Sequence, residues 1–206
     1  MASGCLAKVV CSDAKHNFLV HYLLALAVIL ASPLLFSIRY LDSKQAAQPL
    51  EMLVPLIGII LLTPVFMPEQ NESIRDVVRS KKTSYSLICL LRLLMAMAVL
   101  LSLIGAFVLY MRHCGSAVTF RHFTGSAASA AVLGAVGLFG AAVSDDTITG
   151  YMSAVIYFIT NFLLKDKLGI FYIFSMSSGS FAEKKWLVLM SVILTAGTFT
   201  VRSIRN

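Results

Sequence analysis

Long apolar stretches separated by short polar connections dominate the pattern of residues along the chain. A helix needs about 20 residues to cross the hydrocarbon of a membrane, because every backbone polar group there must be hydrogen-bonded within the protein. The pattern therefore predicts an all-α polytopic membrane protein, with residues 1–206 forming a single transmembrane domain of six transmembrane helices. We place the six spans at about 17–38, 50–68, 87–111, 124–144, 147–164 and 185–202.

The last span reaches membrane length only with help from its first residues. We expect Lys184 and Lys185 to snorkel toward water, and Trp186 to lie in the interfacial belt. The segment before it, residues 168–182, is short and interrupted by glycines and serines. Such a segment is more typical of an interfacial or re-entrant loop than of a crossing. Six crossings put both termini on one side of the membrane, whereas a seventh crossing here would not.

The composition also indicates that lipid, not water, surrounds most of the protein. Hydrophobic residues make up 58% of the 206 residues and charged residues only 13%, and the mean hydropathy is +0.84. Soluble domains carry about 25% charged residues, and a compact soluble domain of this length could bury only part of so much apolar surface. The net charge of +7 is spread along the chain, so it lacks the clustered basic face by which proteins bind nucleic acid.

Basic residues in the connections give a weak orientation. They divide evenly between the two sides of the membrane, so the positive-inside rule alone does not decide it. The densest cluster, Arg75 to Lys82, favours the cytoplasm for the loop after the second span, and Arg92 adds to that side. We therefore predict a multi-pass protein of the cell membrane with cytoplasmic N- and C-termini.

Enzymatic chemistry finds little support in the sequence. No Walker phosphate loop is present, so the chain cannot hydrolyse ATP alone. The cysteines and histidines show no metal-ligand spacing, and we expect no metal and no cofactor bound by this chain. An intramembrane hydrolase would need Asp145 or Asp146, but neighbours on a helix point about 100° apart and cannot share a proton. We identify no second acid at membrane depth, and a solvated turn is the expected role.

Two spans carry distinctive side chains. The fourth consists almost entirely of small residues, including Gly134, Gly137 and Gly140, which let helix backbones approach closely. We expect it to form the packed centre, with a glycine hinge as the alternative. In the fifth span Tyr157 and Asn161 share one face. They serve either structural hydrogen bonds or the wall of a translocation path.

The stretch from Thr63 to Arg92 is the most informative. Prolines end the second span, and Ser73 with Asp76 three residues later resembles a capping box. This pattern predicts a short amphipathic helix over about 71–82, with basic residues on one face. Such a helix either lies on anionic lipid headgroups or docks onto a partner protein.

Here the sequence resembles the permease subunits of the ABC type-2 transporter family, in particular its short bacterial members. The matching features are Pro68-Glu69-Gln70, the short charged helix, the run Arg79 to Ser84, Arg92, and the late stretch from Gly150 to Lys184. Together they cover about half of the chain.

The resemblance implies that the short helix is a cytoplasmic coupling helix, seated in a cleft of a separate ATP-binding subunit. That subunit would hold ATP and Mg, and two permease chains, the same or homologous, would form a dimer in the transporter. The resemblance also implies export and puts residues 175–180 at the outer surface. When the family's docking positions are transferred to the matching residues of this sequence, the resemblance implies that seven residues face the ATPase. They are Glu69, Glu72, Ser73, Arg75, Asp76, Arg79 and Lys81.

Three functional hypotheses follow. The first is the permease of an ABC exporter, and the second is a non-transporting membrane scaffold or immunity protein whose basic loop sits on lipid. The third is an intramembrane hydrolase. The sequence does not identify the transported substrate.

Overall fold

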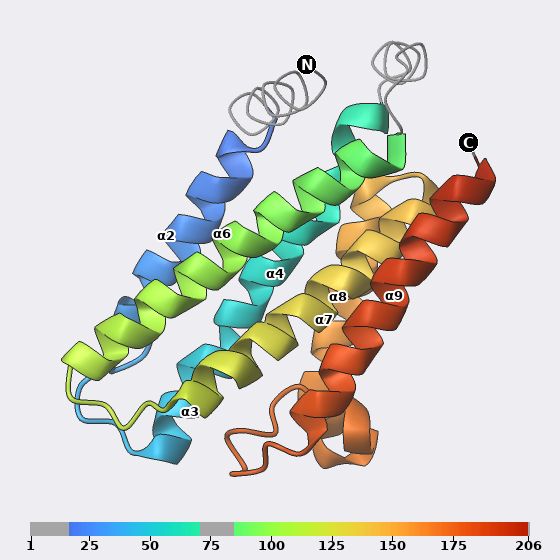
Figure 1. Ribbon diagram of the computed structural model, residues 1–206. Coiled ribbons are helices and arrows are strands. Elements are labelled where there is room, and N and C mark those ends of the chain that lie inside the picture. Colours follow the sequence, from blue (N-terminus) through green and yellow to red (C-terminus); the bar gives the residue numbers. More distant parts are fainter. Residues whose placement is uncertain (1–16, 71–84, 206) are drawn as a thin grey trace.

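A computed structural model describes residues 17–70 and 85–205, which form a bundle of helices (Figure 1). Secondary structure in these two ranges is helical, without strands. The elements are α2 Leu19–Leu35, α3 Ser43–Met52, α4 Val54–Leu62, the 3-10 helix η1 Thr63–Gln70, α6 Tyr85–His113, α7 Phe120–Ser144, α8 Thr147–Leu164, the 3-10 helix η2 Lys165–Phe171 and α9 Glu183–Arg205. Successive long helices run through the bundle in opposite directions (Figure 1).

Five helical stretches are long and apolar enough to cross a membrane. They are Ser43–Pro68, Leu87–His113, Phe120–Ser144, Thr147–Leu164 and Glu183–Ile204. The remaining apolar helix, α2, has 17 residues and is shorter. The predicted all-α class and its membrane-length helices are therefore confirmed, while the sixth crossing stays a prediction. The short helix over 71–82 lies outside the described residues.

The second predicted span begins earlier than expected and is interrupted. Its helix starts at Ser43, and the chain changes direction at Leu53 before α4. Pro55 in the first turn of α4 has no N–H to donate to the preceding turn, which explains the break. At the start of α3 the Asp42 amide donates to Gln45 Oε1 at 3.3 Å.

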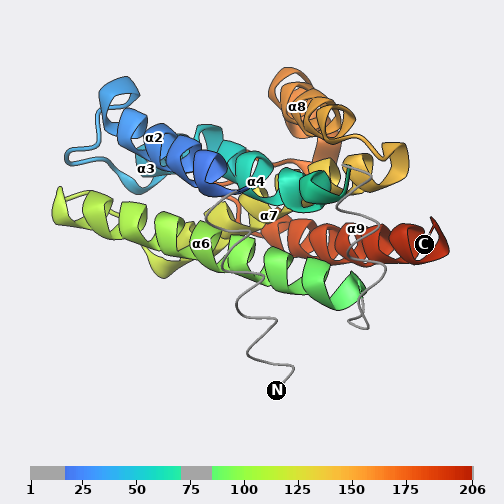
Figure 2. The same cartoon turned by 90° about the horizontal axis from the view of Figure 1, so that it is seen from above.

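Helix α7 lies at the centre, with α2, α4 and α8 on one side and α6 and α9 on the other (Figure 2). Its contact with α4 is close, because a Cβ added at Gly134 would lie 2.6 Å from the Gly58 carbonyl oxygen. A Cβ at Gly58 would overlap the carbonyl of Ala130. Without such small residues the two backbones could not approach in this way.

The outer helices present apolar side chains away from the bundle. Leu34 of α2 is 87% exposed, Leu163 of α8 72% and Ile193 of α9 61%. Apolar faces of this extent are unusual on soluble monomers. They suit contact with lipid chains.

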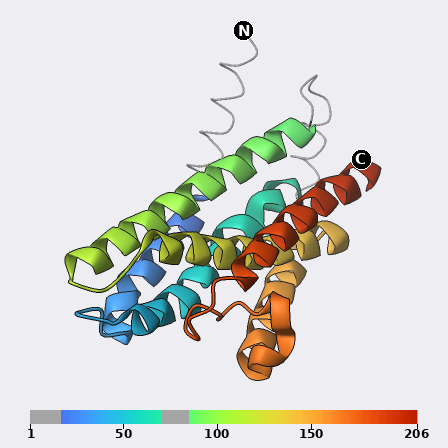
Figure 3. The same cartoon turned by 60° about the horizontal axis from the view of Figure 1, so that its bottom comes forward.

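Between α8 and α9 the chain forms η2 and a series of turns beside the start of α9 (Figure 3). No membrane-length helix occurs between residues 165 and 182. An interfacial or re-entrant segment therefore fits better here than a crossing.

Candidate functional site

The two ends of the bundle each hold an ion pair. We call the end where α2 begins, η1 ends, α6 begins and α9 ends the terminal end. The opposite end, where Phe120 begins α7 and Glu183 begins α9, is the loop end.

A buried ion pair occupies the loop end. Glu51 in α3 is 1% exposed and Lys184 in the first turn of α9 is 6% exposed. Lys184 Nζ lies 2.7 Å from Glu51 Oε1. The same ammonium donates to Ser129 Oγ of α7 at 2.7 Å and to the carbonyl of Ile173. All three donors of the lysine are therefore used.

The carboxylate of Glu51 is also satisfied from the chain after η2. Oε1 accepts the amide of Met176 at 2.7 Å, and Oε2 accepts the amide of Ser177 at 2.9 Å. A buried charge is tolerated when it is paired and its remaining positions are hydrogen-bonded. This cluster thus fastens α3, α7, α9 and the η2–α9 connection to one another.

Sequence reasoning missed this cluster. Lys184 was expected to snorkel, and the structure shows instead that it is buried and paired. Sequence reasoning also missed Glu51, which is buried near the start of the apolar stretch Ser43–Pro68. The available signal was the acid itself, because a charge inside an apolar span needs a partner.

His122 joins the same end of the bundle. Its Nδ1 accepts the Thr119 amide at 3.1 Å, so Nε2 carries the proton and donates to the Ser43 carbonyl at 3.0 Å. The side chain therefore caps α7 and ties it to the start of α3.

A second ion pair lies at the terminal end. Arg202 of α9, 7% exposed, places Nη1 2.7 Å from Asp145 Oδ1, and its guanidinium carbon lies 4.7 Å from the ring centroid of Phe66 in η1. Within the described residues, Nε and Nη2 of Arg202 have no hydrogen-bond partner. This contact joins η1, α9 and the α7–α8 turn.

The acidic doublet forms a turn, as expected. Asp145 ends α7 with a φ of 58°, and Asp146 caps α8 by accepting the amides of Ile148 and Thr149. Hydrogen bonds from the Thr149 amide, the Thr149 hydroxyl and the Ile148 amide hold the pKa of Asp146 below its ordinary value. Its carboxylate is therefore engaged in a helix cap.

Tyr157 and Asn161 both bind the chain around the end of η2. Tyr157 Oη donates to the Phe171 carbonyl at 2.9 Å, and the buried Asn161 accepts the Ile173 amide on Oδ1 at 2.9 Å. These bonds match the structural alternative for the polar face of α8. Their part in a translocation path stays a prediction.

The three glycines of α7 face different neighbours. A Cβ at Gly134 would meet Leu62 and Gly58 of α4, one at Gly137 would meet Thr63 and Ala154, and one at Gly140 would meet Ser153. The helix therefore packs closely on α4, η1 and α8 in turn.

The residues expected to face an ATPase fall mostly outside the described ranges. Glu69 belongs to η1. Glu72, Ser73, Arg75, Asp76, Arg79 and Lys81 lie outside the residues that the structure describes. The described elements that flank them, η1 and α6, meet at the terminal end (Figure 1).

No protein-family model, no curated protein and no solved structure matches the chain.

Proposed function

We propose that the chain is the membrane-spanning permease subunit of an ABC exporter in the bacterial cell membrane, driven by a separate ATP-binding subunit. The resemblance of Pro68 to Arg92 and of the late stretch Gly150 to Lys184 to such permeases motivates the proposal. The observation that carries it is the position of η1 and α6. At the end of the bundle where α2 begins and α9 ends, η1 ends and α6 begins (Figure 1).

The terminal end offers a route by which movement would reach the bundle. Phe66 of η1 is buried and lies under the guanidinium of Arg202, which pairs with Asp145. A displacement of residues 71–82 by a partner would pull on η1 and therefore on α9 and the α7–α8 turn. Interfaces of this kind shift between discrete arrangements, which is how small local movements become global ones.

The energy for the cycle comes from the partner. ATP and Mg bind there, and nucleotide shifts the equilibrium only by its differential affinity for the two conformations. In this proposal Glu69, Glu72, Ser73, Arg75, Asp76, Arg79 and Lys81 contact the ATPase. A second permease chain, identical or homologous, completes the membrane pore, and Tyr157 and Asn161 are candidates for its wall.

Charge reversal tests the docking. We expect Arg75→Glu with Arg79→Glu to remove an ATP-binding subunit from the purified complex and to abolish transport, while the chain stays in the membrane. The matched control is Arg39→Glu with Lys44→Glu, an equal charge change at exposed residues of the loop end, which should keep the complex. Both are read by mild-detergent pull-down from native membranes.

Two results would contradict the proposal. One is retention of the ATPase and of transport in the Arg75→Glu, Arg79→Glu variant. The other is purification of the unmodified chain without any ATP-binding protein, which would favour the scaffold hypothesis.

A further inference from the structure

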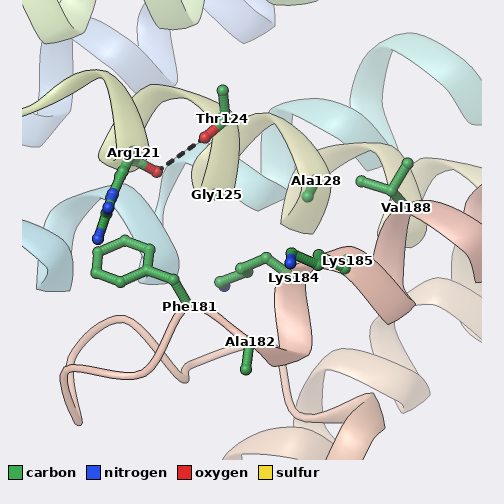
Figure 4. A pocket seen from close by; sticks show the side chains of 9 residues that line it. All are labelled: Arg121, Thr124, Gly125, Ala128, Phe181, Ala182, Lys184, Lys185 and Val188. Atoms are coloured by element: carbon green, nitrogen blue, oxygen red, sulfur yellow. Dashed lines mark hydrogen bonds between the residues drawn. The ribbon is translucent and has the colours of Figure 1, made fainter.

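Two cavities lie one after the other between α7 and α9, the first at the loop end, and we call them together the groove. Its first part is a cavity of about 500 Å³, with walls that include Thr124, Ala128, Phe181 and Val188 (Figure 4). Arg121 from the start of α7 and Lys185 from the start of α9 also line it. Both of these basic residues are exposed.

Charge in this cavity is unbalanced. Lys184 forms part of the wall, but its ammonium is neutralised by Glu51 and its donors are used. Among the residues that the structure describes, no carboxylate lines the cavity. The nearby Glu183 accepts a hydrogen bond from the Ser180 hydroxyl at 2.6 Å. Arg121 and Lys185 therefore present two cationic groups to whatever enters.

A second cavity, of about 370 Å³, lies about one helical turn further along the same two helices, and we call it the apolar channel. It is lined by Ala131 and Ala135 of α7, by Val192 and Thr195 of α9, and by Met97 of α6. Residues 128, 131 and 135 follow one another at helical spacing, as do residues 188, 192 and 195, so each helix shows one face to both cavities. Both α6 and α9 border α7 at this position (Figure 2).

A cationic opening followed by an apolar channel fits one class of molecule. A free phosphate would use only the first cavity, and an uncharged apolar chain only the second. We propose that the groove binds an anionic phospholipid, with its phosphate between Arg121 and Lys185 and an acyl chain along Ala135 and Val192. Arginine suits this role because its guanidinium forms paired hydrogen bonds with phosphate oxygens.

The site stands apart from the ATPase docking segment. It lies at the loop end and along the lipid-exposed side of α9, so it does not depend on the proposed transport function. Anionic lipid attracts each nearby Lys or Arg enough to give roughly a fivefold preference per residue. Two such residues predict a preference for phosphatidylglycerol over phosphatidylcholine of roughly 25-fold.

Native mass spectrometry of the purified full chain in neutral detergent measures this preference directly. The probes are phosphatidylglycerol and phosphatidylcholine with identical chains. We expect Arg121→Gln with Lys185→Gln to remove most of the preference. Arg39→Gln with Lys44→Gln, exposed residues at the same end of the bundle, should keep it. Equal binding of the two lipids, or an equal loss of the preference in both double variants, would overturn the proposed lipid site.

A second pair of variants tests the apolar channel. Val192 lines the channel and is 60% exposed, while its neighbour Ile193 is 61% exposed and points to another face of α9. We expect Val192→Trp to reduce bound phosphatidylglycerol several-fold and Ile193→Trp to leave it unchanged. Similar binding by both would show that no chain occupies the groove and would overturn the proposal.

Competition with soluble glycerol phosphate distinguishes binding of a whole lipid from binding of a phosphate group alone. At concentrations matching the lipid it should not displace phosphatidylglycerol, because it lacks the chain. Displacement would mean that the cavity binds a phosphate group alone. A second copy of the chain is the remaining occupant: loss of a dimer in Val192→Trp, without any lipid preference in the unmodified chain, would contradict the lipid site.

Discussion

The two ends of the bundle hold their buried charges in different ways. At the loop end, the carboxylate of Glu51 and the ammonium of Lys184 are both buried, and together they bond to four further groups of the protein. At the terminal end, Arg202 is buried but its partner Asp145 is 42% exposed. The first arrangement fixes one relative position of four elements. The second is open to water on one side and so is easier to rearrange.

This difference indicates which end of the bundle could rearrange during the proposed transport cycle. A multiply bonded, dry cluster opposes relative displacement of the helices that share it. An ion pair whose carboxylate is half-exposed gains less, since water competes for that carboxylate. The terminal end, which should rearrange more easily, is also where η1 ends and α6 begins. The proposed ATP-binding subunit would act at this end.

Removing one partner of the loop-end pair should have the largest effect. Lys184→Met leaves the Glu51 carboxylate buried without its counter-charge, so we expect the free energy of unfolding to fall by about 3–5 kcal/mol. Thermal unfolding in detergent measures it. Lys167→Met, at an exposed lysine, is the control.

The double variant Glu51→Leu with Lys184→Met sharpens this result. It removes both charges, so it should be more stable than Lys184→Met alone. Equal stability of Lys184→Met and the unmodified chain would show that the pair does not fasten the loop end.

Adding a side chain where α4 and α7 cross should cause the next largest loss in the free energy of unfolding. This crossing lies between the two ends of the bundle. Gly134→Ala puts a methyl group 2.6 Å from the Gly58 carbonyl oxygen, and we expect a loss of about 1–3 kcal/mol. At Gly105 the nearest atom to such a methyl is 3.7 Å away, on Phe123. Gly105→Ala should therefore not destabilise the protein, and a loss equal to that of Gly134→Ala in thermal unfolding would argue against close packing.

The terminal-end pair should matter less for stability. Arg202→Gln removes the contact with Phe66 and the pairing with Asp145, and we expect a loss of about 1–2 kcal/mol. The loss in Lys184→Met should exceed it under the same conditions. The opposite order would reverse the assignment of a fastened end and a movable end.

The smallest effect concerns the turn beside Asp145. Asp146→Ala removes both acceptors of the α8 cap, whereas Asp146→Asn keeps one of them, so the alanine variant should unfold at a lower temperature than the asparagine variant. The pKa of Asp146 is lowered by hydrogen bonds, so its stabilising effect is present above the ordinary aspartate pKa and is lost as pH falls through the lowered value. A pH-independent difference between the unmodified chain and Asp146→Ala would contradict this role of the carboxylate.

The helical class followed from the sequence because apolar length is a strong signal in membranes. The small residues of the fourth span predicted a central helix, and α7 lies at that place (Figure 2). The turn at Asp145 and Asp146 was also predicted. In each case a local pattern decides the outcome.

The loop-end cluster could not be found in the same way. Glu51 and Lys184 are distant in sequence, and only tertiary packing brings them together with Ser129. A lysine at the start of an apolar helix has two outcomes, snorkelling or burial with an acid, and the choice depends on whether an acid lies opposite.

Thiol labelling tests the central claim most directly, namely that residues 71–82 meet an ATPase in the cytoplasm. In a chain whose native cysteines are replaced by serine, Ser80→Cys is compared with Ala117→Cys, an exposed position of the α6–α7 loop. We expect a membrane-impermeant maleimide to label Ala117→Cys in intact cells, and Ser80→Cys only after permeabilisation. Labelling of Ser80→Cys in intact cells would contradict the account.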